Sequence, residues 1–120
     1  MDILDATRKN DSAAAEAAIK AGAALDRQDH NGMTALMQAV DNDNLPIARL
    51  LLKAGCKVDL VDKYGQTALM LAAGRGICAM VKAILDRRPN TRLVAISGAT
   101  ALQFAAGNGH AEVARLLKGK

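Results

Sequence analysis

The feature that most constrains this chain is a segment that occurs three times at a spacing of 33 residues. The central copy, residues 65–76, reads GQTALMLAAGRG; GMTALMQAVDND stands at residues 32–43 and GATALQFAAGNG at residues 98–109. Five positions, occupied by Gly, Thr, Ala, Leu and a later Ala, are identical in the three copies. A fixed period of this length is typical of proteins that stack one supersecondary unit on the next.

The period divides the chain into about four units, which we expect to form a single domain spanning residues 1–120. Residues 29–61 and 62–94 are complete units, whereas residues 1–28 and 95–120 are shortened. Because each unit is too small to bury its own apolar face, the units must lend each other a shared core.

Within a unit, the residue types predict a turn followed by two short helices. The pattern Asp-x-x-Gly at residues 29–32 and 62–65 combines a side chain that bonds backbone amides with a residue that tolerates a positive φ. A threonine then stands where the first helix should begin, with a hydroxyl able to cap it: Thr34, Thr67 and Thr100. Helices of this length are unstable alone and depend on stacking.

The unit resembles the ankyrin repeat, whose pattern is close to D-x-x-G-x-T-P-L-H-x-A-A-x-x-G-H-x-x-x-V-x-x-L-L-x-x-G-A. Residues 29–56 match it as DHNGMTALMQAVDNDNLPIARLLLKAGC, residues 62–89 as DKYGQTALMLAAGRGICAMVKAILDRRP, and residues 95–120 as AISGATALQFAAGNGHAEVARLLKGK. The resemblance covers the whole chain. It implies an all-α solenoid of helix-turn-helix units joined by β-hairpin-like loops.

The chain departs from the family pattern at two positions of the first helix in the last three units, and at the end of the second helix in the third unit. The family's Pro is replaced by Ala, and its His by Met37, Met70 and Gln103. The hydrogen bond from Thr to His is therefore lost in the second and third units, where we expect Met packing to replace it. Arg88 and Pro89 replace the family's Gly-Ala, and we expect that helix to end differently, because Arg disfavours a left-handed φ.

The turn that follows Pro89 also lacks its Asp, since Ala95 stands there. We therefore expect residues 86–97 to be the least regular part of the array.

The residues that carry most enzyme chemistry are scarce. His30 and His110 are the only histidines, and Cys56 and Cys78 lack metal-ligand spacing. GRGICA, residues 74–79, fits a dinucleotide fingerprint but follows no predicted strand. We expect no catalytic site, cofactor or metal. Both cysteines align with small or apolar positions, which indicates a structural role in the core.

Composition indicates a chain of the cytoplasm. The N-terminus has no apolar run typical of a signal peptide, and no segment approaches the length of a membrane span. The net charge is +4, from 16 basic and 12 acidic residues scattered without a block. A nucleic-acid partner is therefore not expected, although weak binding to an anionic surface or nucleic acid remains an alternative.

The family resemblance implies that partners bind at the turn tips and the first helices, on a concave face. Tyr64 and Arg75 are the first choices for binding energy, because Tyr and Arg dominate interface hot spots. The charges on this face would alternate along the array, which suits a protein partner. Carrying the family's contact positions onto this sequence selects Arg8, Lys9, His30, Asn31, Met33, Asp41, Asn42, Lys63, Tyr64, Gln66, Arg75, Ile96, Ser97 and Asn108.

These observations favour a non-enzymatic protein-binding module, such as a scaffold, inhibitor or adaptor. The alternative is an interaction segment of a larger multi-repeat enzyme or effector. In the last unit, four apolar residues would have nothing beyond them, which predicts either a homodimer contact or a junction to further repeats. They are Phe104, Val113, Leu116 and Leu117.

Overall fold

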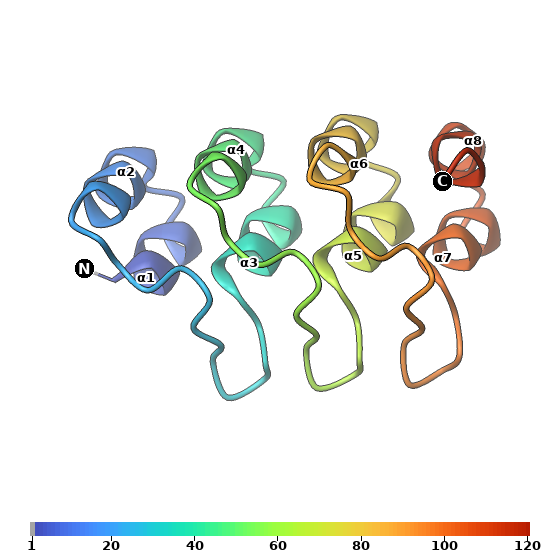
Figure 1. The fold of residues 1–120 in the computed structure, drawn as a ribbon, viewed down its shortest axis with the longest axis horizontal. Helices are drawn as coiled ribbons and strands as arrows, with labels where there is room; N and C mark the ends of the chain where they lie inside the picture. Colours follow the sequence, from blue (N-terminus) through green and yellow to red (C-terminus); the bar gives the residue numbers. More distant parts are fainter. Residues whose placement is uncertain (1) are drawn as a thin grey trace.

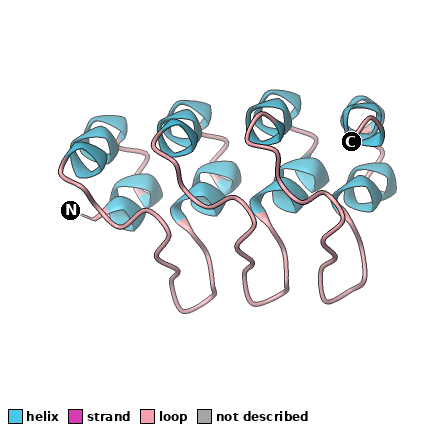
Figure 2. Ribbon diagram, in the orientation of Figure 1, coloured by secondary structure: helices cyan, strands magenta, loops and turns pink. Residues whose placement is uncertain are grey.

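The computed structural model describes residues 2–120 and arranges them as eight α-helices in four pairs (Figure 1). The helices are α1 (Ile3–Arg8), α2 (Ser12–Lys20), α3 (Ala35–Asp41), α4 (Leu45–Lys53), α5 (Ala68–Arg75), α6 (Cys78–Leu85), α7 (Ala101–Gly107) and α8 (Ala111–Lys118). No strand occurs in this described range (Figure 2). The all-α solenoid is thus confirmed, and within residues 2–120 no helix combines the length and apolar character needed to cross a bilayer.

The helices repeat with the period found in the sequence. The first helices α3, α5 and α7 begin at Ala35, Ala68 and Ala101, and the second helices α4, α6 and α8 repeat at the same spacing. Each of the three first helices is capped by the hydroxyl of the preceding threonine, which accepts a hydrogen bond of 3.2 Å from the amide three residues further on. The threonine therefore sets the start of the helix, as the sequence predicts.

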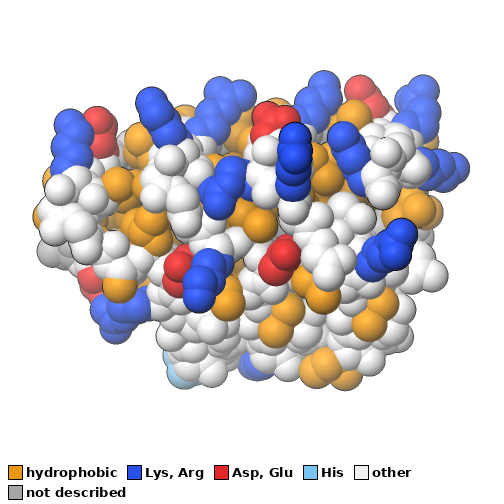
Figure 3. All heavy atoms as spheres, in the orientation of Figure 1, with side chains coloured by type: hydrophobic (Ala, Val, Ile, Leu, Met, Phe, Trp, Pro, Cys, Tyr) orange, Lys and Arg blue, Asp and Glu red, His pale blue; other side chains and the backbone are white. Residues whose placement is uncertain are grey.

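Three hairpin-like loops project from the row of first helices, all to the same side (Figure 1). In the first loop, Asp29 Oδ1 accepts the amides of Asn31 and Met33 at 2.8 and 2.9 Å. Asp62 Oδ1 closes the second loop in the same way, at 2.9 Å to two amides. Side chains fill the spaces between neighbouring loops, so the three form one continuous surface (Figure 3).

Backbone hydrogen bonds fix the loops to one another. Lys63 N–H donates to the carbonyl of Asn31 at 2.9 Å, and Ile96 N–H donates to the carbonyl of Tyr64 at 2.9 Å. Each loop therefore holds the tip of the next, which positions the side chains there relative to the helices.

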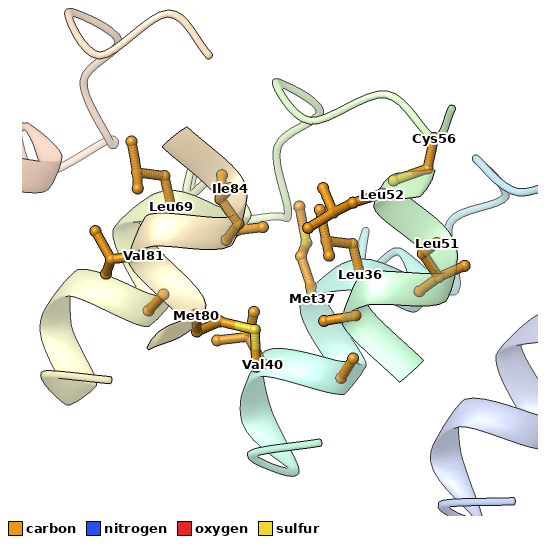
Figure 4. Packing of buried hydrophobic residues seen from close by; sticks show 14 of the residues in the cluster. Leu36, Met37, Val40, Leu51, Leu52, Cys56, Leu69, Met80, Val81 and Ile84 are labelled. Atoms are coloured by element: carbon orange, nitrogen blue, oxygen red, sulfur yellow. The ribbon is translucent and has the colours of Figure 1, made fainter. Parts of the chain in front are cut away.

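The core runs between the two rows of helices and is built from aliphatic side chains (Figure 4). Met80 of α6 and Val40 of α3 lie in it, both fully buried. The alanine that is identical in the three repeated segments, at Ala39, Ala72 and Ala105, is also fully buried. A methyl side chain at these places lets the helices approach closely, which explains why a chain with one Tyr, one Phe and no Trp can form a dense core.

The expectations that residues 86–97 are the least regular part of the array and that their helix ends differently are wrong for the backbone. Arg88 adopts φ +52°, so the second helix of the third unit ends in a left-handed residue, as α4 does at Gly55 with φ +93°. The loop after it closes through the backbone bonds that the other loops use, with Ala95 N–H donating to Ala99 O at 2.9 Å. Ser97 Oγ, 3.4 Å from the amide of Ala99, partly replaces the missing Asp carboxylate.

A cation that sequence reasoning did not single out holds the end of the third unit in place. Arg87 donates from Nη1 to the carbonyl of Leu52 at 2.6 Å and from Nη2 to the carbonyl of Cys56 at 3.1 Å. Leu52 lies in the last turn of α4, and Cys56 lies three residues beyond the end of that helix. The guanidinium therefore ties the third unit to the second.

The prediction that the last unit has an exposed apolar outer face is also wrong in part. Val113 is fully buried and Leu117 is buried, because α8 packs against both α6 and α7. Phe104 and Leu116 are half-buried and pack against the core. The terminal pair of helices buries its apolar side on the preceding pair, as the second and third pairs do.

The predicted replacement of the family's Thr-to-His bond is found in the third unit. The amide of Thr67 donates to the Met70 sulfur at 3.5 Å. In the last unit Gln103 Oε1 accepts the amide of Thr100 at 2.9 Å, which completes a capping box.

Candidate protein-binding surface

Two hollows lie where the loop tips meet the first helices, and we call this side of the molecule the hairpin face. The first hollow lies between the first two loops and α3, and is lined by Asp29, Asn31, Met33, Gln38, Asp41, Asp62, Lys63 and Tyr64. The second lies between the last two loops and α7, and is lined by Tyr64, Gln66, Ala95, Ile96, Ser97 and Phe104.

Tyr64 stands between the hollows and lines both. The residue is 58% exposed, and its backbone is held on both sides by hydrogen bonds to the Asp62 carboxylate and to the amide of Ile96. The Lys63 ammonium lies 5.1 Å from the centre of its ring, within cation–π range. The aromatic ring is thus presented on a fixed backbone, which reduces the entropy lost on binding.

The second hollow is apolar and uncharged. Ile96, at its rim, is 79% exposed, the highest value among the large hydrophobic residues of the described chain. Half-buried Phe104 of α7 and buried Ala95 also line this hollow. Ile96 and Phe104 thus form a small apolar patch, which makes the second hollow a candidate contact site for an apolar side chain.

The first hollow is polar, and two of its carboxylates, Asp29 and Asp41, form ion pairs with arginines of neighbouring units. Arg8 of α1 lies 3.8 Å from Asp29, and Arg75 of α5 lies 3.5 Å from Asp41 of α3. Burial tends to raise the pKa of Asp29, but the amides of Met33 and Asn31 outweigh it, and the pKa lies below the ordinary 3.8. Asp29 therefore stays ionised in the loop at neutral pH.

Comparison of the sequence with models of protein families shows which family the chain belongs to. A family model described as ankyrin repeats in three copies matches residues 3–93, and one described as ankyrin repeat matches residues 97–119. The chain belongs to the ankyrin-repeat family. A search of curated proteins finds no match. Ankyrin repeats are generally protein–protein interaction modules.

Eight of the contact positions carried over from the ankyrin pattern line the two hollows. They are Asn31, Met33, Asp41, Lys63, Tyr64, Gln66, Ile96 and Ser97. Arg8 and Arg75 lie beside the first hollow through their ion pairs. Lys9 and His30 are exposed and line neither hollow.

The remaining two positions connect ankyrin repeats to each other. The side-chain amide of Asn42 donates to Thr7 O at 3.2 Å, and that of Asn108 donates to Gly74 O at 2.9 Å. Each side chain therefore spans from one repeat to the preceding one, and a partner that used it would have to compete with this bond.

Sequence reasoning missed five residues of the hollows. Asp29, Asp62 and Ala95 share one loop position and were considered only as turn residues. The other two are Gln38 and Phe104. They occupy one position of the ankyrin repeat, two periods apart, and half-buried Leu71 occupies it in the repeat between. The sequence contained a signal for this position. It varies among polar, aliphatic and aromatic residues, whereas the Leu two residues before it and the Ala directly after it are identical in the three copies.

The residues weighed for other chemistry have structural surroundings. His110 Nε2 lies 3.0 Å from Gly74 O, and Cys56 is buried, which raises the pKa of its thiol to about 11. Cys78 is only half-buried, so its expected burial is partial. Across residues 2–120, no three His, Cys, Asp or Glu side chains are grouped so that they could hold a metal ion.

Proposed function

We propose that this protein is a non-enzymatic interaction module that binds a partner protein through the hairpin face. The observation that carries the proposal is Tyr64, which is exposed on a fixed backbone between two hollows. The single ankyrin-repeat domain, with repeats at about residues 1–28, 29–61, 62–94 and 95–120, serves to hold these loops in a row.

The partner would place an apolar side chain in the second hollow, against Ile96 and Phe104, and polar groups over the first hollow. Tyr64 would contact both parts of the partner. Arg75 contributes less than its residue type predicts, because its guanidinium is already paired with Asp41. We therefore rank Ile96 above Arg75 as an anchor.

The test is affinity capture from the source cells with the wild-type protein and with the double variant Tyr64→Ala, Ile96→Ala. Both side chains are exposed, so the fold should be retained. Each anchor should contribute about 2 kcal/mol or more to binding, so the variant should lose the partner.

The matched control is Glu16→Ala, Lys20→Ala, which removes an exposed ion pair from α2 without changing the net charge. It should capture the partner as well as wild type does. Equal capture of the same proteins by wild type and by the Tyr64→Ala, Ile96→Ala variant would contradict the proposal.

A further inference from the structure

The charges of the chain, scattered along the sequence, are segregated by the fold. The second helices α4, α6 and α8 and the loops after them, residues 45–61, 78–94 and 111–120, carry ten Lys and Arg against three Asp and Glu, a net charge of +7. The rest of the chain carries six Lys and Arg against nine Asp and Glu, a net charge of −3. Figure 3 shows Lys and Arg side chains gathered along the upper side, over the second helices.

Three of these cations occupy the same position in successive repeats: Arg49 of α4, Lys82 of α6 and Arg115 of α8. All three are exposed, and α6 contacts both α4 and α8. Packed helices lie about 8–10 Å apart, so these cations form a ladder along the solenoid. In the first repeat the same position is Glu16, which pairs with Lys20.

The basic strip consists of the three cations of the ladder and four further exposed cations, Lys53, Arg92, Lys118 and Lys120. Lys53 shares a groove with Arg49, and Lys118 lies beside Arg115. Arg92, Lys118 and Lys120 line one hollow at the end of the array. Arg87 does not belong to the strip, because its guanidinium donates to the carbonyls of Leu52 and Cys56.

No cation of the basic strip forms an ion pair with any described carboxylate. The five ion pairs of the described residues all lie elsewhere and engage Arg8, Lys20, Arg27 and Arg75, four of the six remaining cations. A face that served only for solvation could alternate its charges, as α2 does. The chain instead keeps unpaired like charges next to each other, which opposes folding.

Helix dipoles account for only part of the strip. A cation in the last turn stabilises a helix by about 0.3–1 kcal/mol. This explains Lys53 of α4, Lys82 of α6, and both Arg115 and Lys118 of α8. It does not explain Arg49, which lies a turn earlier in α4, or Arg92, which lies in a loop.

We propose that the basic strip binds the phosphate backbone of duplex nucleic acid, independently of its base sequence. Protein partners and membrane surfaces usually add an apolar or lipid anchor to the charge attraction. None of the large exposed hydrophobic residues of the described chain lies on α4, α6 or α8, and both aromatic residues, Tyr64 and Phe104, line the hairpin face. A phosphate backbone, in contrast, can be bound through charge alone, because the protein's cations release the counterions condensed on it.

The test measures binding of the full chain to short fluorescent DNA and RNA duplexes of unrelated sequence across a salt series. Affinity should fall steeply with salt and be insensitive to base sequence. The variant Arg49→Gln, Lys82→Gln should bind at least about ten-fold more weakly at low salt, and its slope of log K against log salt should be shallower by about 2. Tighter binding of RNA or of DNA identifies the natural source of the phosphates.

The matched control is Lys20→Gln, Arg27→Gln, which removes the same charge from cations outside the strip that pair with Glu16 and Asp2. It should bind duplexes as wild type does. The proposal fails if the two variants weaken binding equally, if duplexes do not bind at low salt, or if phosphatidylserine vesicles or polyglutamate bind more tightly at the same salt.

Discussion

Three residues other than glycine adopt a positive φ among residues 2–120, and one of them belongs to a type that seldom does so. Asn10 and Asp43 are types that tolerate the left-handed region. Arg88, at φ +52°, occupies the position that Gly55 and Gly22 occupy in earlier repeats. Its side chain is exposed, so the left-handed backbone is imposed by the chain around it.

Replacing Arg88 by Gly should raise the free energy of unfolding by about 1 kcal/mol, because glycine adopts this φ without a Cβ penalty. The measurement is urea unfolding followed by circular dichroism. Arg88→Ala is the control: it removes the same side chain but keeps the Cβ, and should leave stability near that of wild type. An equal gain in both variants would assign the effect to the guanidinium.

Which residue contacts could be predicted depends on how far apart their partners lie in the chain. The Thr34, Thr67 and Thr100 caps were predictable, because each bonds an amide three residues away. The clamp formed by Arg87 was not, since its acceptors lie 35 and 31 residues earlier. A contact of that kind depends on how two repeats stack and has no local pattern.

At the scale of elements, the hairpin loop is the unit on which the candidate site depends. Asp29 closes the first loop with two hydrogen bonds, and its pKa is lower in the folded chain than its ordinary 3.8. A carboxyl whose pKa is lower when folded stabilises the fold above its unfolded pKa. That contribution is lost as the pH falls through the folded pKa.

The variant Asp29→Asn should therefore flatten the loss of stability in acid. Its Oδ1 can still accept the two amides, but it does not titrate. From about pH 7 to about pH 5 both proteins should keep constant urea midpoints, and below about pH 4 the wild-type midpoint should fall more steeply. Asp2, whose pKa is lowered by its bond to the Asp5 amide, supplies part of the slope that remains. Identical acid profiles would contradict this role of Asp29.

The helices themselves were largely predictable from the sequence, but which side of α8 faces the core was not. The first helices of the last three repeats begin directly after the threonines that the sequence indicates. Val113 and Leu117 were expected to be bare because the chain ends near them, and they are buried. The side of α8 that faces inward is set by its contacts with α6 and α7. The buried residues at equivalent positions of earlier repeats predict this side better than the nearness of Lys120 does.

At the scale of the whole molecule, stability depends on contacts between neighbouring repeats. Gly76, at φ +71°, lies under the ring of His110 from the next repeat, and a Cβ at this place would overlap the ring atoms. Gly109 is its equivalent one period later, at φ +78°, and has no atom within 4 Å of such a Cβ. The two glycines share a backbone conformation and differ in whether a following repeat covers them.

Replacing Gly76 by Ala should therefore cost about 2–4 kcal/mol, from backbone strain together with displacement of His110. Gly109→Ala, as the control, should cost only the strain of about 1–2 kcal/mol. In an array coupled through nearest neighbours, a weakened boundary lets the outer unit open first. Hydrogen exchange of Gly76→Ala should then show the amides of α7 and α8 exchanging well before those of α3 and α4. Uniform acceleration along the chain would mean that the four repeats unfold as one body, whatever the strength of a single boundary.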